Sequence, residues 1–245
     1  MKGEPARLPA RLLVPTQTTV DRAAARSYAG HMTELNLWRQ HLQAVPATVW
    51  ERTDLTALVL AENGLTEIPD DVARLSRLRM LDLGHNALNQ LPDALGALSG
   101  LTDFLYVHDN RLSALPASFA QLKRLRYLNI SDNPLGVFPE AVTKMACLAE
   151  LRAENCGLEE LPNTIRGMTK LRELGLRGNA LTTLPEAISG LVELRALDLR
   201  ANALTSLPAV LARLPRLEKL DLRWTDFAEP PWLAELEARG CRVYR

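Results

Sequence analysis

The chain has 245 residues, with 29 Lys or Arg against 29 Asp or Glu side chains, so its formal net charge at pH 7 is zero. This balance disfavours broad binding to nucleic acid or to an acidic membrane surface. The longest uninterrupted apolar runs have five residues, far too few to span a membrane, and residues 1–17 lack the apolar core of a signal peptide. Three cysteines without a CxxC pair fit a reducing compartment, so we expect a cytoplasmic location.

Residues 1–31 are predicted to form an N-terminal cap. Leu12, Val14 and Gln17 precede similar residues by 23 positions, which predicts a degenerate first strand. The following segment, Thr18–Gly30, has the start and stop signals of a capping helix.

A repeat then occupies residues 32–230. Its clearest marker is a column of nine prolines spaced 23 residues apart, with one step of 24, namely Pro46, Pro69, Pro92, Pro116, Pro139, Pro162, Pro185, Pro208 and Pro231. Between prolines the pattern is LxxLxLxxNxLxxLPxxLxxLxx, and positions are numbered below from its first leucine. A single copy cannot bury its own leucines, so the nine copies are expected to stack into one solenoid.

Each copy is predicted to contain one strand and one short helix. The apolar residues of LxxLxL alternate, as they do in a strand with one buried face. After each proline they recur at steps of three, which suits a short helix whose first residue needs no N–H partner. The predicted strands begin at Glu34, Ala57, Met80, Phe104, Tyr127, Glu150, Glu173, Ala196 and Lys219.

This pattern resembles the leucine-rich repeat family, specifically its 23-residue class found in Ras-suppressor and plant Ras-group proteins and in many bacterial proteins. The resemblance implies an α/β solenoid, a curved right-handed arc with a parallel sheet on its concave side and short helices on its convex side. It also implies that a ligand would meet the concave sheet.

Position 9 is a column of asparagines, whose amides can satisfy buried backbone groups of neighbouring turns. Its members are Asn63, Asn86, Asn110, Asn133, Asn179 and Asn202, with Gln40, Cys156 and Thr225 in the remaining copies. We expect those three replacements to loosen the ladder locally.

Residues 231–245 are predicted to form the C-terminal cap. The segment 231–240 has the pattern of a longer final helix, and Val243 follows Leu220 by 23 residues, which predicts a tenth, closing strand. With both ends capped, we expect a complete and monomeric solenoid.

The single proline step of 24 places an extra residue between Leu101 and Leu105. Such an insertion predicts a β-bulge that re-aims neighbouring side chains. One interpretation is that the bulge supports a functional surface in the fourth copy. The alternative is that it turns Phe104 into the core and leaves Tyr106 as an isolated surface ring.

The outward positions 3, 5 and 7 of that region are unusually aromatic. Phe104, Tyr106 and Tyr127 lie there, flanked by Met80 and His108. Exposed contiguous apolar surface with tyrosines is typical of protein interfaces. We therefore predict a protein or peptide partner at this place.

A second candidate surface is a column of arginines at position 7, Arg177, Arg200 and Arg223, with Arg152 diagonal to it. Strands about 4.8 Å apart would stack these guanidinium groups, which could clamp an acidic peptide or a phosphate. Because Glu, Asp and Arg alternate here, a solvated lattice of salt bridges is the favoured alternative.

Catalysis has little support, because the sequence has no GxxxxGK[ST], HExxH, GxSxG or CxxC motif. Position 8 does carry Glu62, His85, Asp109 and Asp132 in successive copies, a pattern that suits either a cation site or a solvated rim. The sequence therefore favours a non-enzymatic protein-binding module without cofactors. The alternatives are a type III secreted bacterial effector and, at lower weight, a metal-dependent enzyme on the concave rim.

Overall fold

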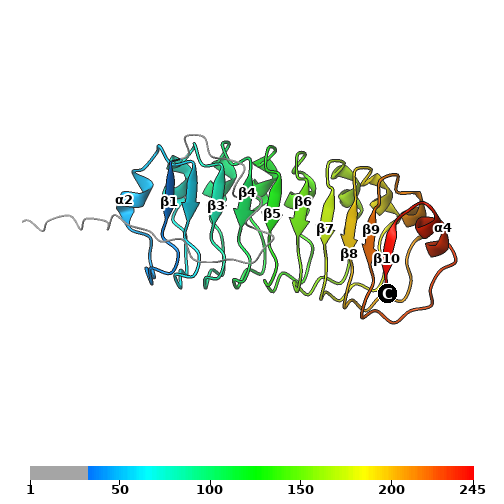
Figure 1. Cartoon of the computed structure of the whole chain (residues 1–245). Helices are drawn as coiled ribbons and strands as arrows, with labels where there is room; N and C mark the ends of the chain where they lie inside the picture. The colour runs from blue at the N-terminus through cyan, green and yellow to red at the C-terminus, as the bar shows by residue number, and fades with distance from the viewer. Residues whose placement is uncertain (1–32) are drawn as a thin grey trace, which may run out of the picture.

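The computed structural model describes residues 33–245 and shows one ten-stranded parallel sheet whose strand order follows the sequence (Figure 1). The strands are β1 (Glu34–Asn36), β2 (Ala57–Val59), β3 (Met80–Asp82), β4 (Phe104–Tyr106), β5 (Tyr127–Asn129), β6 (Glu150–Arg152), β7 (Glu173–Gly175), β8 (Ala196–Asp198), β9 (Lys219–Asp221) and β10 (Arg242–Tyr244). The nine predicted strand starts and the closing strand are confirmed. The predicted strand and helix of the N-terminal cap lie outside the described residues.

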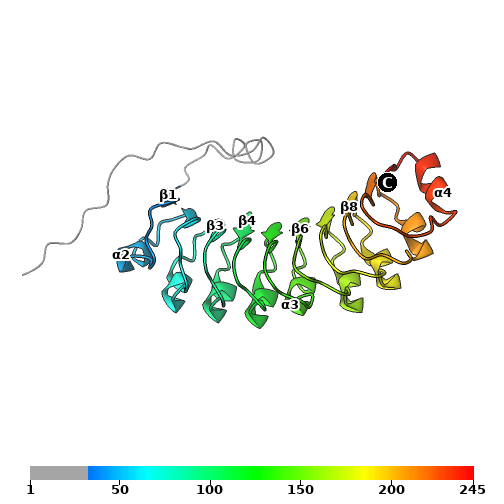
Figure 2. The same ribbon diagram turned by 90° about the horizontal axis from the view of Figure 1, so that it is seen from below.

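The sheet lines the inner side of a curved arc, and the short helices lie on its outer side (Figure 2). The helices are α2 (Ala47–Trp50), α3 (Glu140–Thr143) and α4 (Leu233–Ala238), and the 3₁₀ helices are η1 (Asp70–Arg74), η2 (Asp93–Ala97), η3 (Ala117–Gln121), η4 (Asn163–Gly167), η5 (Glu186–Gly190) and η6 (Ala209–Arg213). Proline precedes the first residue of η1 to η6, of α2 and of α3, where extended backbone turns into a helix. This confirms the expected α/β solenoid.

The core is a continuous column of leucines between the sheet and the helices. Strands pair in an unbroken register, so that Leu105 in β4 lies between Leu81 in β3 and Leu128 in β5. All three side chains are fully buried. The central residue of each strand thus points into the core, and its two neighbours point to the inner face of the arc.

The asparagine column forms the predicted ladder of buried hydrogen bonds. The amide of Asn133 donates to the carbonyl oxygens of Val107 and Ile130, each at 3.0 Å, and its oxygen accepts from the N–H of Leu112 at 3.0 Å. Where Cys156 replaces asparagine, its thiol donates to the same Ile130 carbonyl at 3.4 Å. Burial raises the pKa of the Cys156 thiol to about 12, so this donor keeps its proton at neutral pH.

The extra residue of the fourth copy lies before β4 and does not disturb it. Asp103 and Phe104 both donate their N–H groups to the carbonyl of Arg79, as the corresponding residues of regular copies do, whereas the next copy bonds separately to the carbonyls of Thr102 and Asp103. The extra residue therefore changes the backbone pairing just before β4, at Thr102 and Asp103, whereas β4 itself keeps its register with both neighbours, so the predicted re-aiming does not extend to the side chains of β4.

The insertion instead turns the side chain of Asp103 inward, where it is only 4% exposed. Arg79 and Arg126, from the copies on either side, approach its carboxylate at 3.0 and 3.1 Å. A buried carboxylate needs such partners, because its charge would otherwise be costly to desolvate. The extra residue thus has a structural role that the repeat pattern alone does not reveal.

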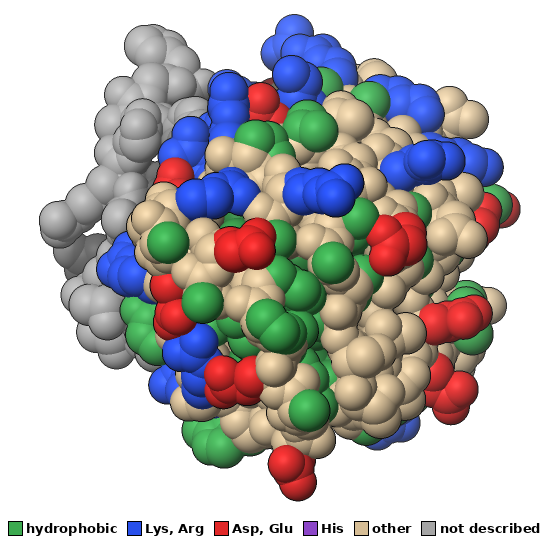
Figure 3. All heavy atoms as spheres, turned by 90° about the vertical axis from the view of Figure 1, so that its right-hand side faces the viewer, with side chains coloured by type: hydrophobic (Ala, Val, Ile, Leu, Met, Phe, Trp, Pro, Cys, Tyr) green, Lys and Arg blue, Asp and Glu red, His purple; other side chains and the backbone are tan. Residues whose placement is uncertain are grey.

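Helix α4 and strand β10 cover the C-terminal end of the column. Leu233 and Leu236 are buried against it, and Arg239 donates to the carbonyl of Leu214 at 2.7 Å. Figure 3 views this end, where charged side chains are interspersed with hydrophobic ones and Lys and Arg gather in the upper half of the view. The division into 1–31, 32–230 and 231–245 stays a prediction.

Candidate functional site

Three aromatic side chains, Phe104, Tyr106 and Tyr127, form a contiguous group on the inner face, called here the aromatic patch. Ring centroids of Phe104 and Tyr106 are 6.0 Å apart with nearly parallel planes, and Tyr127 lies 5.4 and 5.0 Å from them. All three side chains are half-buried. Because strand register places them side by side, the patch follows from positions 3 and 5 of adjacent copies.

The two flanking residues predicted for this surface also lie beside it. Met80 is the register partner of Phe104 and is half-buried, and the His108 ring contacts Tyr106 edge to face at 6.0 Å. The alternative in which Phe104 enters the core was wrong, since its backbone keeps the outward orientation of position 3.

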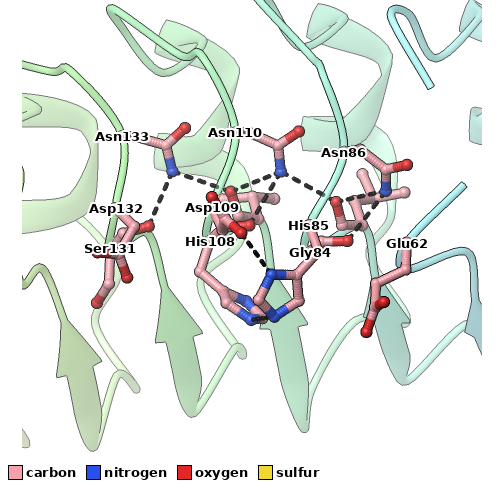
Figure 4. Close-up of polar contacts among 12 residues, drawn as sticks. Glu62, Gly84, His85, Asn86, His108, Asp109, Asn110, Ser131, Asp132 and Asn133 are labelled. Atoms are coloured by element: carbon pink, nitrogen blue, oxygen red, sulfur yellow. Dashed lines mark hydrogen bonds and ion pairs between the residues drawn. The ribbon is translucent and has the colours of Figure 1, made fainter. Parts of the chain in front are cut away.

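A chain of three polar side chains continues from the patch toward the ends of the strands. Nδ1 of His85 lies 2.5 Å from Oδ2 of Asp109, and Nε2 of His85 lies 3.2 Å from Nε2 of His108. Figure 4 shows the rings of His85 and His108 in contact between neighbouring turns, with Asp109 above them in the same turn as His108. The sequence pattern placed His85 at position 8 and His108 at position 7, and it did not predict the contact between them.

The other two acidic residues of position 8 do not join this chain. Glu62 accepts a hydrogen bond from the indole of Trp38 at 3.1 Å and pairs with Arg39, while Asp132 accepts from Asn155 at 2.8 Å. Across residues 33–245 no group of three or more His, Cys, Asp or Glu side chains is arranged to hold a metal ion.

Backbone geometry explains why position 8 has this composition. Its residues have positive φ angles, among them Glu62 at 56°, His85 at 53°, Asp109 at 48° and Asp132 at 56°. Asn, Asp, His and Gly tolerate this left-handed conformation better than most residues. A turn requirement therefore accounts for most of the column that suggested a cation site.

The arginine column is largely neutralised within the sheet. Nε of Arg200 donates to the Asp198 carboxylate at 2.9 Å, and Nε of Arg223 donates to Asp221 at 2.9 Å. Arg152 lies 2.7 Å from Glu150; burial opposes its charge, but the neighbouring carboxylates outweigh this effect and raise the pKa of Arg152. The lattice interpretation fits these three residues.

Arg177 differs from the rest of the column, because its guanidinium makes no hydrogen bond or ion pair with residues 33–245. It is half-buried. A hollow of about 160 Å³ on the same face is lined by other residues, among them both cations and carboxylates, namely Arg152, Arg200, Lys219, Glu150, Glu154, Glu173 and Asp198.

Trp224 is an interface candidate that the sequence analysis missed. Its side chain is 69% exposed, at position 8 of the ninth copy, with φ at 60°. The guanidinium carbons of Arg200 and Arg223 lie 5.8 and 5.6 Å from its ring. The signal in the sequence is a bulky tryptophan at position 8 of the last copy. That position requires a positive φ angle, which glycine and asparagine adopt more easily than tryptophan.

Comparison with protein families gives one consistent result. A model described as leucine-rich repeat region matches residues 70–174, and a model described as leucine rich repeat matches residues 30–88 and 169–227, so together they cover 30–227 without a gap. No curated protein sequence matches the chain.

Solved structures support the same fold. A leucine-rich repeat protein of Leptospira interrogans has a TM-score of 0.66 at 23% identity, over 95% of this chain and 70% of its own. The ectodomain of the Arabidopsis thaliana receptor kinase GASSHO1/SCHENGEN3, in complex with Casparian strip integrity factor 2, has a TM-score of 0.60 at 26% identity, over 82% of this chain and 28% of its own. A structure of a TLR13–ssRNA complex has a TM-score of 0.64 at 25% identity, over 72% of this chain and 26% of its own.

Proposed function

Because this chain belongs to the leucine-rich repeat family, whose fold is commonly used for protein–protein interaction, we propose that it binds a protein or peptide partner on its concave face. The aromatic patch is the proposed centre of the site. Met80 and His108 extend it, and Arg177 supplies a cation farther along the arc.

The observation that carries the proposal is the contiguous, half-buried cluster of three aromatic rings on the inner face. Apolar surface that stays in contact with water costs free energy, and contiguous patches of it usually mark an interface. Tyrosine and arginine are among the residues that most often dominate binding energy. The leucine column forms the core of the copies that carry the patch, and the three rings lie outside this core on the inner face.

Two neighbours in structure were solved with ligands, one with an integrity factor and one with single-stranded RNA. For this chain the zero net charge disfavours RNA, because phosphate binding needs an excess of basic side chains. A partner with apolar anchor residues and an acidic group fits the combination of the patch and Arg177.

The proposal is tested by affinity capture from a nuclease-treated native lysate, followed by calorimetry with the purified partner. Tyr106→Ala should weaken binding at least about tenfold, equivalent to 1–2 kcal/mol, without changing the melting temperature appreciably. Tyr244→Ala is the matched control, because Tyr244 is also exposed but lies at the C-terminal edge. A partner that binds both variants as tightly as the wild type would contradict the proposal.

The cytoplasmic location, the monomeric state and the absence of catalysis stay predictions, as does delivery into a host cell. No helix within residues 33–245 has the length and apolar character needed to cross a membrane. The three cysteines are free, with Cys147 exposed and Cys156 and Cys241 buried.

A further inference from the structure

The contact between His85 and His108 has an unusual geometry. Their Nε2 atoms face each other at 3.2 Å, and the planes of the two rings are inclined by 79°. The side chain of His85 is 46% exposed, so solvent reaches the pair. Two imidazole nitrogens at this separation are close enough for both to bind one transition-metal ion.

The proton positions follow from the third member of the chain. Oδ2 of Asp109 can only accept, so the Nδ1 of His85 donates to it across 2.5 Å. When both rings are neutral, His85 presents a lone pair at Nε2, and His108 donates its Nε2–H to that atom. A metal ion would replace this proton, and His108 would then carry its proton on Nδ1.

The fold provides room for the second ring. Gly84 lies at position 7 of the neighbouring copy, and a Cβ atom there would be 2.4 Å from Cε1 of His108 and 2.8 Å from its Nδ1. Any other residue at 84 would therefore displace the imidazole from its contact with His85. Position 8 brings His85 toward the same point by its left-handed turn, with φ at 53°.

We propose that His85 and His108 bind a divalent transition-metal ion of the Zn²⁺ class through their Nε2 atoms. With metal–nitrogen bonds of about 2.0–2.1 Å, two ligands at a tetrahedral centre lie about 3.3 Å apart, close to the distance observed here. The carboxylate of Asp109 holds the outer nitrogen of His85, an arrangement that orients metal-binding histidines and increases their basicity.

The remaining coordination positions belong to water, because residues 33–245 offer no third ligand arranged around this point. The site is therefore expected to bind more weakly than a structural zinc site with four protein ligands. Imidazole ligands select Zn²⁺ and its neighbours over Mg²⁺ and Ca²⁺, which prefer oxygen. The inference does not depend on the proposed partner.

The experiment titrates the metal-free full chain with Zn²⁺ at pH 7.5, using calorimetry and a competing fluorescent chelator. Each variant takes a residue that the same position has in another copy. His85→Asn follows Asn155 and tolerates the positive φ, and His108→Ser follows Ser131. Either change should weaken Zn²⁺ binding by more than tenfold, and Asp109→Asn should weaken it about tenfold.

His41→Asn is the matched control, because His41 also has a positive φ, at 52°, but lies two copies away. It should leave the Zn²⁺ affinity unchanged. In NMR spectra the imidazole C–H signals of His85 and His108 should shift on addition of Zn²⁺, while those of His41 should not. Mg²⁺ in place of Zn²⁺ should shift none of them.

Two results would overturn the inference. One is the absence of Zn²⁺ binding by the wild-type chain up to about 1 mM, the range in which even weak sites fill. The other is equal binding by the wild type, His85→Asn and His108→Ser, which would place the ion elsewhere. Melting curves recorded with a chelator should be the same for all variants, so that a folding defect is distinguished from a lost ligand.

Discussion

The inner face of the arc contains two regions that share one backbone but differ in side-chain chemistry. Strands β4 and β5 present the aromatic patch, whose ring centroids lie 5.0–6.0 Å apart and whose side chains are half-buried. In the copies of β8 and β9, the carboxylates of Asp198 and Asp221 at position 5 pair with Arg200 and Arg223 at position 7.

This difference separates charged side chains that neutralise one another from aromatic side chains that stay partly in contact with water. In the C-terminal region Arg223 neutralises Asp221, whose side chain is fully buried, so these charges serve the sheet itself. In the central region the aromatic rings contact one another yet keep part of their surface in water. The repeat position of an outward residue does not determine whether its charge is neutralised; the neighbouring side chains do.

The largest expected effect tests whether the two regions rest on the same scaffold. Leu128 in β5 and Leu220 in β9 occupy the same inward position and are both fully buried. Leu128→Ala and Leu220→Ala should each lower the free energy of unfolding by about 2–5 kcal/mol, through lost burial and the cavity left behind. Urea denaturation measures both values. A small loss for one of them alone would show that the core is not uniform along the arc.

The sequence predicted this scaffold well because the spacing of leucines in the repeat determines where each strand begins and which of its side chains are buried. Nine strand starts could be predicted in this way, because shifting a strand by one residue would move its buried leucines to the solvent-facing side of the sheet. The inward turn of Asp103 could not be predicted, because it depends on Arg79 and Arg126 from two other copies.

The candidate site was predictable only in part, for the same reason. The outward column placed Phe104, Tyr106 and Tyr127 together, because register alone determines that contact. The meeting of His85 with His108 depends on the small size of Gly84 and on a left-handed turn, neither of which has a signal in hydrophobic periodicity.

A smaller effect, dependent on pH, should appear in the C-terminal region. Burial opposes the ionisation of Asp221, but the hydrogen bonds from the Arg223 side chain and backbone outweigh it and lower the pKa of Asp221. A lowered folded-state pKa stabilises the fold above the unfolded pKa of about 3.9, and this contribution is lost as the pH falls through the folded value.

Asp221→Asn should therefore lower the free energy of unfolding by about 1–3 kcal/mol at pH 7, where the wild-type carboxylate is ionised. The difference between the two proteins should shrink as the pH is lowered below about 4. Urea denaturation at several pH values between neutrality and about 3 measures it. If the difference in the free energy of unfolding between the two proteins stays constant over this range, the charge of Asp221 does not contribute to stability.

The smallest effect distinguishes a paired arginine from an unpaired one at the same position of neighbouring copies. Arg200 is held by Asp198 and lies 3.6 Å from Asp221, so Arg200→Ala leaves two carboxylates facing each other with one cation fewer. We expect a loss of about 1 kcal/mol in the free energy of unfolding, because the pair is partly shielded from water.

Arg177 makes no such contact within residues 33–245. Arg177→Ala should therefore change the stability by no more than about 0.5 kcal/mol, the range of ordinary surface substitutions. Chemical denaturation of both variants in low salt resolves the difference. Equal losses would show that Arg177 has a structural partner, and its assignment to a binding surface would then lose its support.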